Sequence, residues 1–573
     1  MRFACLAFDY DGTLAIEGKI SDELLASLAR VKKTGRNLIL ITGRILKDLQ
    51  FIFPQYELFD LVVAENGAIL YSPSTRITRR LCEPVPCAFV EHLKAKGVNP
   101  LEIGSVIVST WHPNENLIIE AIHEFGLDLH ISFNKGAVMV LPAGMNKRTG
   151  LIAALSQLGH SVHNTIGVGD GENDFVFMDK CEYAVAVANA LPVLKDLADL
   201  TLNKENGQGV REFLDDILLS DQFENTRARR HEILLGYDCS GNEINVPSFN
   251  FKMLIVGPSQ SGKSTACMSV LQQINNLGYQ FCLVDPEGEY ENAPHSVIVG
   301  NEHYAPEMAD ILRLLSDPEN NVVINLLGVP LSERAQFFLQ IFQAVQKMRI
   351  KNGRPHWLVI DEAHHMLHPY WNSILEPVWQ DCQAFVAVTV DPKEISKVVL
   401  QDIDLVLSVG ANSAQTMSAF AQSLGISSIS NDPDGLRYGQ AEAWFRRQSE
   451  VSLKLNLIET PLRHKRHLRK YAEGNLGKQR SFYFTGKNNN LNIRCQNLFL
   501  FMQVGEGLDD ETWLFHLKRG DYSAWVKDAI HDSELAVEIQ SIEKEMDECA
   551  QSREAIRRLI EKRYSLPVRI LGY

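Results

Sequence analysis

The chain has 573 residues, of which 45% are hydrophobic and 22% charged, so it has the composition of a globular protein and is too long for a single core. Its 56 basic and 71 acidic residues leave a net charge of −15, which argues against nucleic-acid or anionic-membrane binding over the whole surface but leaves a local basic patch open. The ten cysteines form no C-x-x-C pair, no apolar run approaches a membrane span, and Met1 to Phe3 lead directly into the first apolar run. We therefore expect a cytoplasmic protein with reduced thiols, no structural zinc, no signal peptide and no membrane partner.

The first apolar run, Ala4 to Phe8, predicts a short buried strand. At its end stand two carboxylates, Asp9 and Asp11, followed by the turn residues Gly12 and Thr13. Asp9 could attack a phosphorus atom to give an aspartyl-phosphate, and Asp11 could protonate the leaving oxygen and then activate water. The stretch therefore predicts a phosphoryl-transfer site with a metal ion.

A helix-like pattern from Asp22 to Lys33 and an apolar strand from Asn37 to Ile41 complete a βαβ unit. Parallel strands of such a unit end at the same edge of the sheet, so the residues after the second strand should lie near Asp9. These residues are Thr42, Gly43 and Arg44. The hydroxyl of Thr42 could bind the phosphoryl oxygens.

A third strand, Thr165 to Val168, leads into the segment Gly169 to Asp174. Asp170 and Asp174 would complete a hard oxygen shell suited to Mg²⁺, and Lys147, at the start of a helix-like run, offers an ammonium group to the phosphoryl oxygens. The expected contacts to the substrate phosphate are Gly12, Gly43, Arg44 and Asn173.

Together these motifs resemble the haloacid-dehalogenase superfamily of phosphatases, in its sugar-phosphatase-like branch with a type IIB cap. The resemblance covers about the first 215 residues. It implies an α/β, Rossmann-like phosphatase core over residues 1–217, with an α+β cap inserted at about Gly67 to Leu141. It also implies that Asp9 is the nucleophile, that Asp11 is the acid and base, and that Mg²⁺ is held by Asp9, the main-chain carbonyl of Asp11, and Asp170. The substrate would be a small phosphorylated compound such as a sugar phosphate.

Within the expected cap, four polar or aromatic residues are candidates for contacts to the substrate: Trp111, His112, Asn134 and Lys135. They could equally be ordinary surface or core residues of the cap. The sequence does not identify the natural ester.

A polar segment over residues 218–231 predicts a linker before a second domain, residues 232–460. The segment Gly257 to Ser264 matches the P-loop pattern at every fixed position, between a strand and a helix. Gly257 and Gly262 would let N–H groups turn toward a nucleotide, Lys263 would reach its β and γ oxygens, and Ser264 would bind Mg²⁺. Thr265 follows as a further nucleotide-binding residue.

A buried strand, Trp357 to Ile360, ends in Asp361 and Glu362. Asp361 would hold magnesium through water and Glu362 would polarise the attacking water, although a carboxylate pair at a strand end can also cap a helix.

Further strands from Phe281 to Val284 and Phe385 to Thr389, with the P-loop and the Asp-Glu-Ala-His segment, resemble the HerA/FtsK-like ATPases. That resemblance implies a RecA-like P-loop domain that hydrolyses ATP, commonly in a homo-oligomeric, hexameric ring with an arginine supplied by the neighbour, and often translocation of nucleic acid. Val390 and Asp391 stand where the family usually carries a polar sensor, which leaves coupling to movement open. The candidates for the arginine are Arg334, Arg349 and Arg354.

Residues 461–573 predict a small accessory domain that ends in a charged amphipathic helix with a break, Glu534 to Lys562. The basic run Arg463 to Lys470 could contact nucleic acid, dock on an acidic face, or be a solvated helix, and we expect at most weak binding of nucleic acid.

The leading hypothesis is a Mg²⁺-dependent phosphatase fused to an ATP-binding and ATP-hydrolysing domain that regulates or assembles it. The alternatives are an assembly protein in which the nucleotide state sets the oligomer, and a nucleic-acid motor whose N-terminal domain processes phosphate ends.

Overall fold

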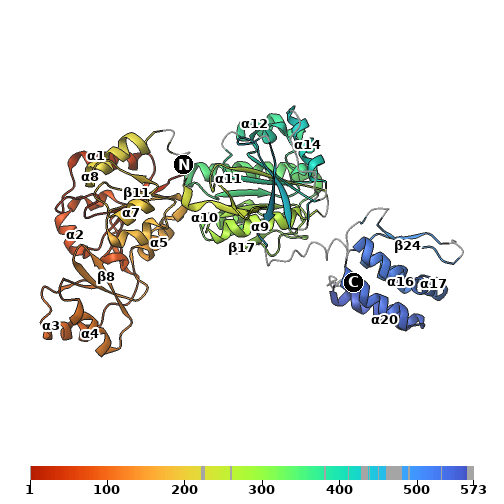
Figure 1. Cartoon of the computed structure of the whole chain (residues 1–573), viewed down its shortest axis with the longest axis horizontal. Helices are drawn as coiled ribbons and strands as arrows, with labels where there is room; N and C mark the ends of the chain where they lie inside the picture. Colours follow the sequence, from red (N-terminus) through yellow and green to blue (C-terminus); the bar gives the residue numbers. More distant parts are fainter. Residues whose placement is uncertain are drawn as a thin grey trace. The chain divides into compact units, whose positions relative to one another are not determined.

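The computed structural model describes residues 2–220, 223, 226, 228–258, 261–379, 382–410, 412–426, 436–437, 439–449, 451–459, 476, 480–487, 491–530 and 532–563. The chain forms two compact units, one of residues 1–288 and 292–460, the other of residues 289–291 and 461–573. The first unit contains two large β-sheets and a smaller one (Figure 1). All ten cysteines are described and none forms a disulfide, as expected. In the described part of the chain, no helix has the length and apolarity to cross a membrane.

The N-terminal sheet has eight strands in the order β12-β11-β10-β1-β2-β3-β4-β5. β1 lies at its centre, parallel to β10 on one side and to β2 on the other. All residues of β1 and β10 are buried, as in a parallel sheet covered on both faces. The strands are β1 (Cys5–Asp9), β2 (Asn37–Ile41), β3 (Leu61–Ala64), β4 (Ile69–Ser72), β5 (Ile77–Arg80), β10 (Thr165–Gly169), β11 (Tyr183–Ala186) and β12 (Leu200–Thr201).

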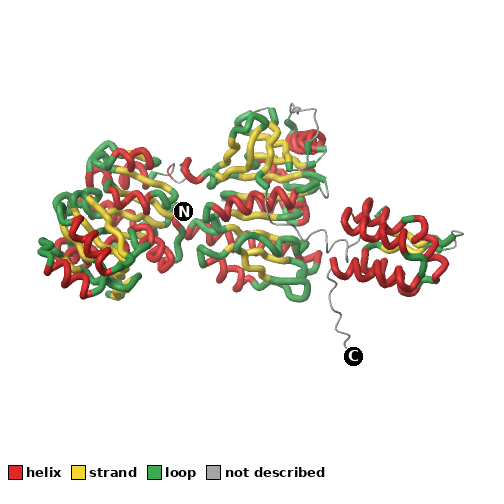
Figure 2. Tube along the Cα trace, turned by 60° about the horizontal axis from the view of Figure 1, so that its bottom comes forward, coloured by secondary structure: helices red, strands yellow, loops and turns green. Residues whose placement is uncertain are grey.

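Helices lie on both sides of this sheet (Figure 2). They are α1 (Asp22–Lys33), α2 (Leu46–Ile52), α5 (Lys147–Leu158), α6 (Phe175–Met178), α7 (Pro192–Leu197) and α8 (Asn206–Glu212). α1 has the predicted bounds because Ser21 caps its first turn through the N–H of Leu24, while Leu24, Leu28 and Val31 repeat on one buried face.

The cap is a separate body of two helices and a four-stranded sheet of order β6-β7-β9-β8. It consists of α3 (Cys87–Ala95), β6 (Glu102–Ile103), β7 (Val108–Trp111), α4 (Glu115–Phe125), β8 (Leu129–Asn134) and β9 (Ala137–Pro142), with a hydrophobic core of its own. It is shorter than the segment expected from Gly67 onward, because Ile69–Ser72 and Ile77–Arg80 pair as an antiparallel extension of the core sheet.

The second large sheet has eleven strands in the order β14-β13-β23-β22-β21-β15-β20-β19-β16-β18-β17, of which the run from β21 to β17 is parallel. The strands are β13 (Ile233–Asp238), β14 (Glu243–Val246), β15 (Lys252–Val256), β16 (Phe281–Asp285), β17 (Ser296–Val299), β18 (Asn321–Asn325), β19 (Trp357–Ile360), β20 (Phe385–Thr389), β21 (Leu405–Val409), β22 (Gln440–Phe445) and β23 (Leu453–Leu457). The helices are α9 (Lys263–Asn276), α10 (Met308–Ser316), α11 (Leu331–Asn352), α12 (Asn372–Trp379), α13 (Lys397–Asp402) and α14 (Ser413–Leu424).

The second unit is a helical body with a two-stranded sheet, and its core is rich in aromatic side chains such as Phe482, Trp513 and Tyr522. Its elements are β24 (Phe482–Phe484), β25 (Ile493–Cys495), α16 (Leu498–Gly507), α17 (Asp510–Arg519), α18 (Asp521–Trp525), α19 (Ser533–Glu545) and α20 (Cys549–Arg563). The helix expected from Glu534 to Lys562 is divided into α19 and α20, so it has the predicted break. The basic run Arg463 to Lys470 lies outside the described residues.

Candidate active site

The carboxyl ends of β1 and β10 bring together three buried carboxylates: Asp9, Asp170 and Asp174. One oxygen from each lies within 4.8 Å of the others. Lys147, at the first position of α5, inserts its ammonium group between two of them, 2.5 Å from Asp9 Oδ1 and 2.5 Å from Asp174 Oδ1. The lysine is only 1% exposed. Four residues predicted from three separate motifs therefore meet in one cluster.

Burial and the neighbouring carboxylate of Asp174 raise the pKa of Asp9 well above its usual value, while the charge of Lys147 opposes this shift. Burial alone would lower the pKa of Lys147, but the two carboxylates beside it outweigh burial and raise it. Lys147 thus stays charged and favours the ionised form of Asp9, the form that can act as a nucleophile.

Asp174 orients the loop after β10. Its Oδ2 accepts hydrogen bonds from the backbone N–H groups of Asp170, at 3.0 Å, and Gly171, at 2.8 Å. Asp170 has one oxygen bound by the hydroxyl of Thr13, at 3.2 Å. Both oxygens of Asp174 are engaged by buried donors, whereas Asp170 Oδ2 pairs with the exposed side chain of Lys135, so Asp9 and Asp170 are the better candidates for direct metal ligands.

The chemistry of this cluster fits Mg²⁺, which prefers oxygen ligands and one or two carboxylates. Asp9 and Asp170 supply buried carboxylate oxygens. A cation of the chain itself already lies there, because Lys135 Nζ is 2.7 Å from Asp170 Oδ2 and 3.2 Å from the main-chain oxygen of Asp11. The site therefore attracts positive charge at the oxygens that the sequence assigned to magnesium.

Thr42 and Arg44 follow β2, at the same edge of the sheet as Asp9. Thr42 is 1% exposed and its hydroxyl accepts from the N–H of Arg44, at 3.1 Å. The guanidinium of Arg44 donates to both oxygens of Asp11, from Nε and Nη2 at 2.7 Å each. The predicted phosphate ligand Arg44 is thus paired with the predicted acid in this structure.

The remaining predicted phosphate contacts border the same cluster. A Cβ at Gly12, where φ is +86°, would lie 2.3 Å from Lys135 Nζ, so the absence of a side chain leaves the space that the ammonium fills. A Cβ at Gly43 would lie 3.2 Å from Met139 Sδ. Asn173 donates to Asn66 Oδ1 at 3.1 Å.

The cap is held to the core through Glu65, which sequence analysis missed. This fully buried carboxylate accepts from the backbone N–H groups of Ser105, Val106 and Ile107, at 2.8, 2.8 and 3.2 Å. Glu65 and the adjacent Asn66 both have φ of +52°, an uncommon backbone for residues other than glycine. An acidic residue directly after the apolar strand Leu61–Ala64 was the only local signal for it.

Of the four cap residues predicted to contact the substrate, Asn134 and Lys135 lie beside the carboxylate cluster. For Trp111 and His112 the structure gives no contact with it. Asn134 and Lys135 form the turn region between β8 and β9 that faces the loop after β10. Trp111 is 49% exposed, and His112 pairs with Glu115 inside the cap.

The residues predicted to form a P-loop also lie at the carboxyl edge of their sheet, after β15. Gly257 precedes Pro258, Gly262 has φ of +97°, and Lys263 Nζ donates to the carbonyl of Pro258 at 3.0 Å. Lys263 and Ser264 begin α9 as buried residues, and Thr265 is exposed. The intervening residues 259 and 260 lie outside the described part of the chain.

Asp361 and Glu362 follow β19, which is separated from β15 by β20 alone. With neighbouring strands about 4.8 Å apart, the two strand ends lie about 10 Å from each other, a span that a metal ion and a water molecule can bridge. Both carboxylates are buried, and Glu362 has φ of +42°.

Two of the three arginine-finger candidates are wrong, because their side chains are fully buried among residues of the same chain. Arg349 donates to the carbonyls of Pro355, His356 and Ala384. Arg354 donates to Gly159 and other carbonyls and is 0% exposed. Arg334 is partly exposed and donates to the carbonyls of Val329 and Pro286.

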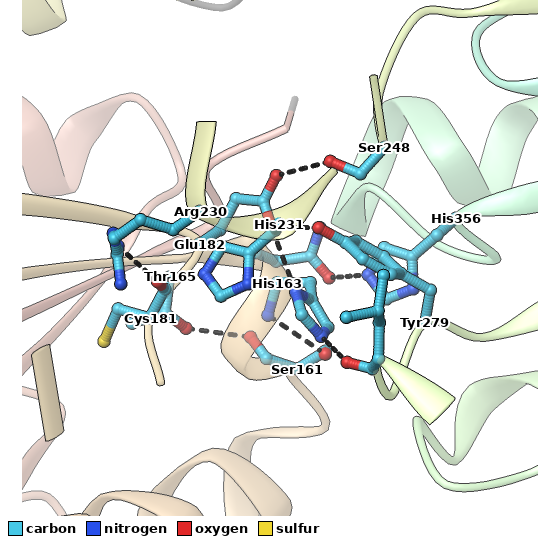
Figure 3. A network of polar contacts seen from close by, with 12 residues as sticks. Ser161, His163, Thr165, Cys181, Glu182, Arg230, His231, Ser248, Tyr279 and His356 are labelled. Atoms are coloured by element: carbon cyan, nitrogen blue, oxygen red, sulfur yellow. Dashed lines mark hydrogen bonds and ion pairs between the residues drawn. The ribbon is translucent and has the colours of Figure 1, made fainter. Parts of the chain in front are cut away.

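A buried network joins the two large sheets, centred on Glu182 (Figure 3). Its carboxylate, 1% exposed, accepts from Arg2 at 2.7 Å and from Tyr279 at 2.6 Å, and it contacts His163 Nδ1 at 3.0 Å. His163 Nε2 lies 2.8 Å from the carbonyl of Leu277, at the end of α9.

Comparisons with known proteins place relatives over the N-terminal part. Residues 6–98 and 102–214 match the family of haloacid dehalogenase-like hydrolases. Phosphoglycolate phosphatase 1 of Saccharolobus solfataricus is 28% identical over 226 residues, which cover 37% of this chain and 93% of that protein. Phosphoglycolate phosphatase of Methanothermobacter thermautotrophicus is 27% identical over 216 residues, 36% of this chain and 95% of that protein. A solved haloacid dehalogenase-like hydrolase from Bacteroides thetaiotaomicron is 18% identical, with 38% of this chain and 100% of that chain covered and a TM-score of 0.33.

Proposed function

Because the N-terminal part of the chain is a phosphatase domain of the haloacid-dehalogenase superfamily, as its motifs predicted, we propose that it is a Mg²⁺-dependent phosphomonoesterase that acts through an aspartyl-phosphate on Asp9. The observation that carries this proposal is the position of Asp9. It lies at the carboxyl end of the central strand, held by the buried ammonium of Lys147 and beside Asp170.

In this mechanism Asp9 attacks phosphorus, a P–O bond to Asp9 forms, and the bond to the leaving oxygen breaks. Asp11 gives that oxygen a proton and then takes a proton from the water that hydrolyses the intermediate. Arg44 must first release Asp11, and its side chain is 36% exposed, so the guanidinium can turn toward an incoming phosphate. Lys147 and the Thr42 hydroxyl would bind the phosphoryl oxygens.

Magnesium would be held by Asp9, Asp170 and the main-chain oxygen of Asp11, and when bound it would neutralise charge on the phosphoryl oxygens. We take the substrate class to be small phosphorylated metabolites, either phosphorylated acids, as the names of the phosphoglycolate phosphatases suggest, or sugar phosphates.

The test is hydrolysis of a generic aryl phosphate by the full chain with and without Mg²⁺, and by the variant Asp9→Asn. The variant should lose turnover by several orders of magnitude, since the nucleophile is removed. Turnover of Asp9→Asn at the wild-type rate would eliminate the covalent mechanism.

We also propose that the second domain binds and hydrolyses ATP with Mg²⁺. Support comes from the match to the P-loop pattern, the buried Lys263 at the start of α9, and the carboxylates Asp361 and Glu362 one strand away along the same sheet edge. Lys263→Ala should weaken ATP binding, whereas Glu362→Gln should bind ATP and fail to hydrolyse it. Normal hydrolysis by Glu362→Gln would show that another residue is the base.

Regulation of the phosphatase by nucleotide is the third element of the proposal. α9 has 14 residues and so spans about 21 Å, with Lys263 at one end and the Leu277 contact to His163 just beyond the other. His163 stands two residues before β10, the strand that ends beside Asp170. Phosphatase rates of the full chain with and without ATP test this coupling.

Assembly into a homo-oligomer, which the ATPase resemblance implies, stays a prediction. Measuring the size of the protein in solution with and without ATP and Mg²⁺ tests it.

A further inference from the structure

Lys135 reaches the active site from the tip of a cap hairpin. It follows the last residue of β8 and, with Gly136, makes the two-residue turn into β9, where Asn134 pairs with Ala137. Lys135 has φ of +49° and Gly136 has φ of +87°. Turns with two positive φ values favour asparagine, aspartate and glycine, and a lysine in this conformation costs about 1–3 kcal/mol. A strained residue at the edge of a site is a reason to ask what its side chain does there.

The side chain places its ammonium group on two oxygens of the core. Nζ lies 2.7 Å from Asp170 Oδ2 and 3.2 Å from the main-chain oxygen of Asp11. Asp170 is 2% exposed, whereas the side chain of Lys135 is 53% exposed. The cation is therefore held at one end by a buried carboxylate but can withdraw into solvent.

These two oxygens are the ones proposed to hold magnesium. An ammonium group and Mg²⁺ cannot both occupy them, so a metal ion that enters must displace Lys135. The displaced ammonium stays tethered to a turn of the cap, where it can pair with an anionic group of the substrate.

The space beside this turn is also prepared for a ligand. Asn173 is 8% exposed, and its Oδ1, like Asn134 Oδ1, is a buried atom without a hydrogen-bond partner among the described residues. Both oxygens border Gly171, where a Cβ would lie 2.9 Å from Asn134 Oδ1 and 3.3 Å from Asn173 Oδ1. Buried polar atoms are rarely left unsatisfied, and amide oxygens are acceptors, so a hydrogen-bond donor is expected between cap and core.

We propose that Lys135 is the substrate-binding cation of the cap, and that it selects small phosphomonoesters whose leaving portion carries a carboxylate. This inference rests on the proposed phosphatase function and adds the residue that determines which substrate is bound. Lys147 of the core would bind the phosphoryl group, and Lys135 of the cap would bind the leaving group. Without metal, the same ammonium group occupies the metal position.

The first test is calorimetric titration of Mg²⁺ into the full chain in the absence of substrate and nucleotide. Lys135→Met should bind Mg²⁺ about tenfold more tightly than the wild type, because the competing cation is gone. Lys94→Met is the matched control, since Lys94 lies on α3 of the same cap, 47% exposed and paired with Glu91, and it should leave Mg²⁺ affinity unchanged. Equal affinity of Lys135→Met and the wild type would overturn the placement of Lys135 at the metal position.

The second test compares two esters, 2-phosphoglycolate and ethyl phosphate, which differ in the carboxylate. Lys135→Met should lower kcat/KM for 2-phosphoglycolate about 10- to 100-fold, the range for a lost hydrogen bond to a charged group, and change kcat/KM for ethyl phosphate less than about threefold. An equal loss on both esters would overturn the assignment of Lys135 to the carboxylate. If the wild type hydrolyses an aryl phosphate but neither ester, the assignment of Lys135 to a carboxylate is overturned. If it hydrolyses none of the three compounds, the proposed phosphatase function fails, while the Mg²⁺ titration still decides whether Lys135 occupies the metal position.

Discussion

The buried Glu182 network offers a direct test of how firmly the phosphatase domain is joined to the part of the chain that contains the second large sheet. Glu182→Gln keeps the shape of the side chain but removes the negative charge that Arg2 and His163 face, and it disturbs the hydrogen bond from Tyr279. Removing one partner of a buried, hydrogen-bonded charge pair costs about 3–5 kcal/mol. At about 2–4 °C per kcal/mol for a domain of this size, the melting transition of the phosphatase domain should fall by roughly 6–20 °C.

The assay is differential scanning calorimetry of the full chain at neutral pH. Glu120→Gln is the control, because its side chain is 64% exposed and lies 4.0 Å from Lys96, so its loss should cost less than about 1 kcal/mol. A transition in Glu182→Gln within about 2 °C of the wild type would refute the reasoning, since it would mean that the charge of Glu182 contributes little to the folded state.

We also predict how the difference in melting temperature between the wild type and Glu182→Gln depends on pH. Burial alone would raise the pKa of Glu182, but the hydrogen bond from His163 and the charges of Arg2 and His231 outweigh it and hold the pKa well below the usual range. As the pH falls, the unfolded chain takes up this proton first, near pH 4.3. The stabilisation by Glu182 is therefore complete above about pH 4.3 and is lost below it, and the difference in melting temperature between wild type and Glu182→Gln should narrow there.

Three further outcomes follow from the site. Lys147→Met removes the ammonium between two buried carboxylates and should abolish measurable ester hydrolysis; a residual rate above about 10% would show that the lysine is dispensable. Glu65→Ala leaves the backbone N–H groups of residues 105–107 without their acceptor, so limited proteolysis should cut the cap earlier than in the wild type, and an unchanged digestion pattern would contradict this. Gly67→Ala would place a Cβ 2.0 Å from the carbonyl of Asn146 at a φ of +106° and should lower the melting temperature by several degrees, as calorimetry would show.

The central strands and their site residues could be predicted from sequence because their signals are local. β2 has the predicted bounds, β1 is shifted by one residue at both ends, and β10 is one residue longer at its C-terminal end. A parallel sheet then requires that the ends of these strands meet at one edge, and Asp9 and Asp170 do so. The β4–β5 hairpin was assigned to the cap because nothing in its residues shows which sheet an antiparallel extension will join.

The partners of these residues were not predictable, because they come from distant parts of the chain. Glu65 binds a segment 40 or more residues away, and Lys135 meets Asp170 across 35 residues and Asp11 across 124. His163 meets Leu277 across 114 residues. A lone charged or titratable residue carries no local pattern that names its partner, and burial of such a residue is visible only when the fold is known.

Cations of the chain itself balance the four carboxylates of the phosphatase site. Asp9 and Asp174 share Lys147, whereas Asp11 is bound by Arg44 and Asp170 by Lys135. Each acid therefore has a cation of the chain, and binding of metal and phosphate must exchange some of these pairs.

Burial decides which pairs exchange. Lys147 is 1% exposed and cannot leave without stranding a charge, whereas Arg44 is 36% exposed and Lys135 is 53% exposed. Withdrawal of the two exposed cations into water carries little desolvation cost, since each regains its hydration. The site thus keeps one fixed cation for the nucleophile and has two movable cations. One must leave Asp11 before that acid can give up a proton, and the other must leave Asp170 before a metal ion can bind there.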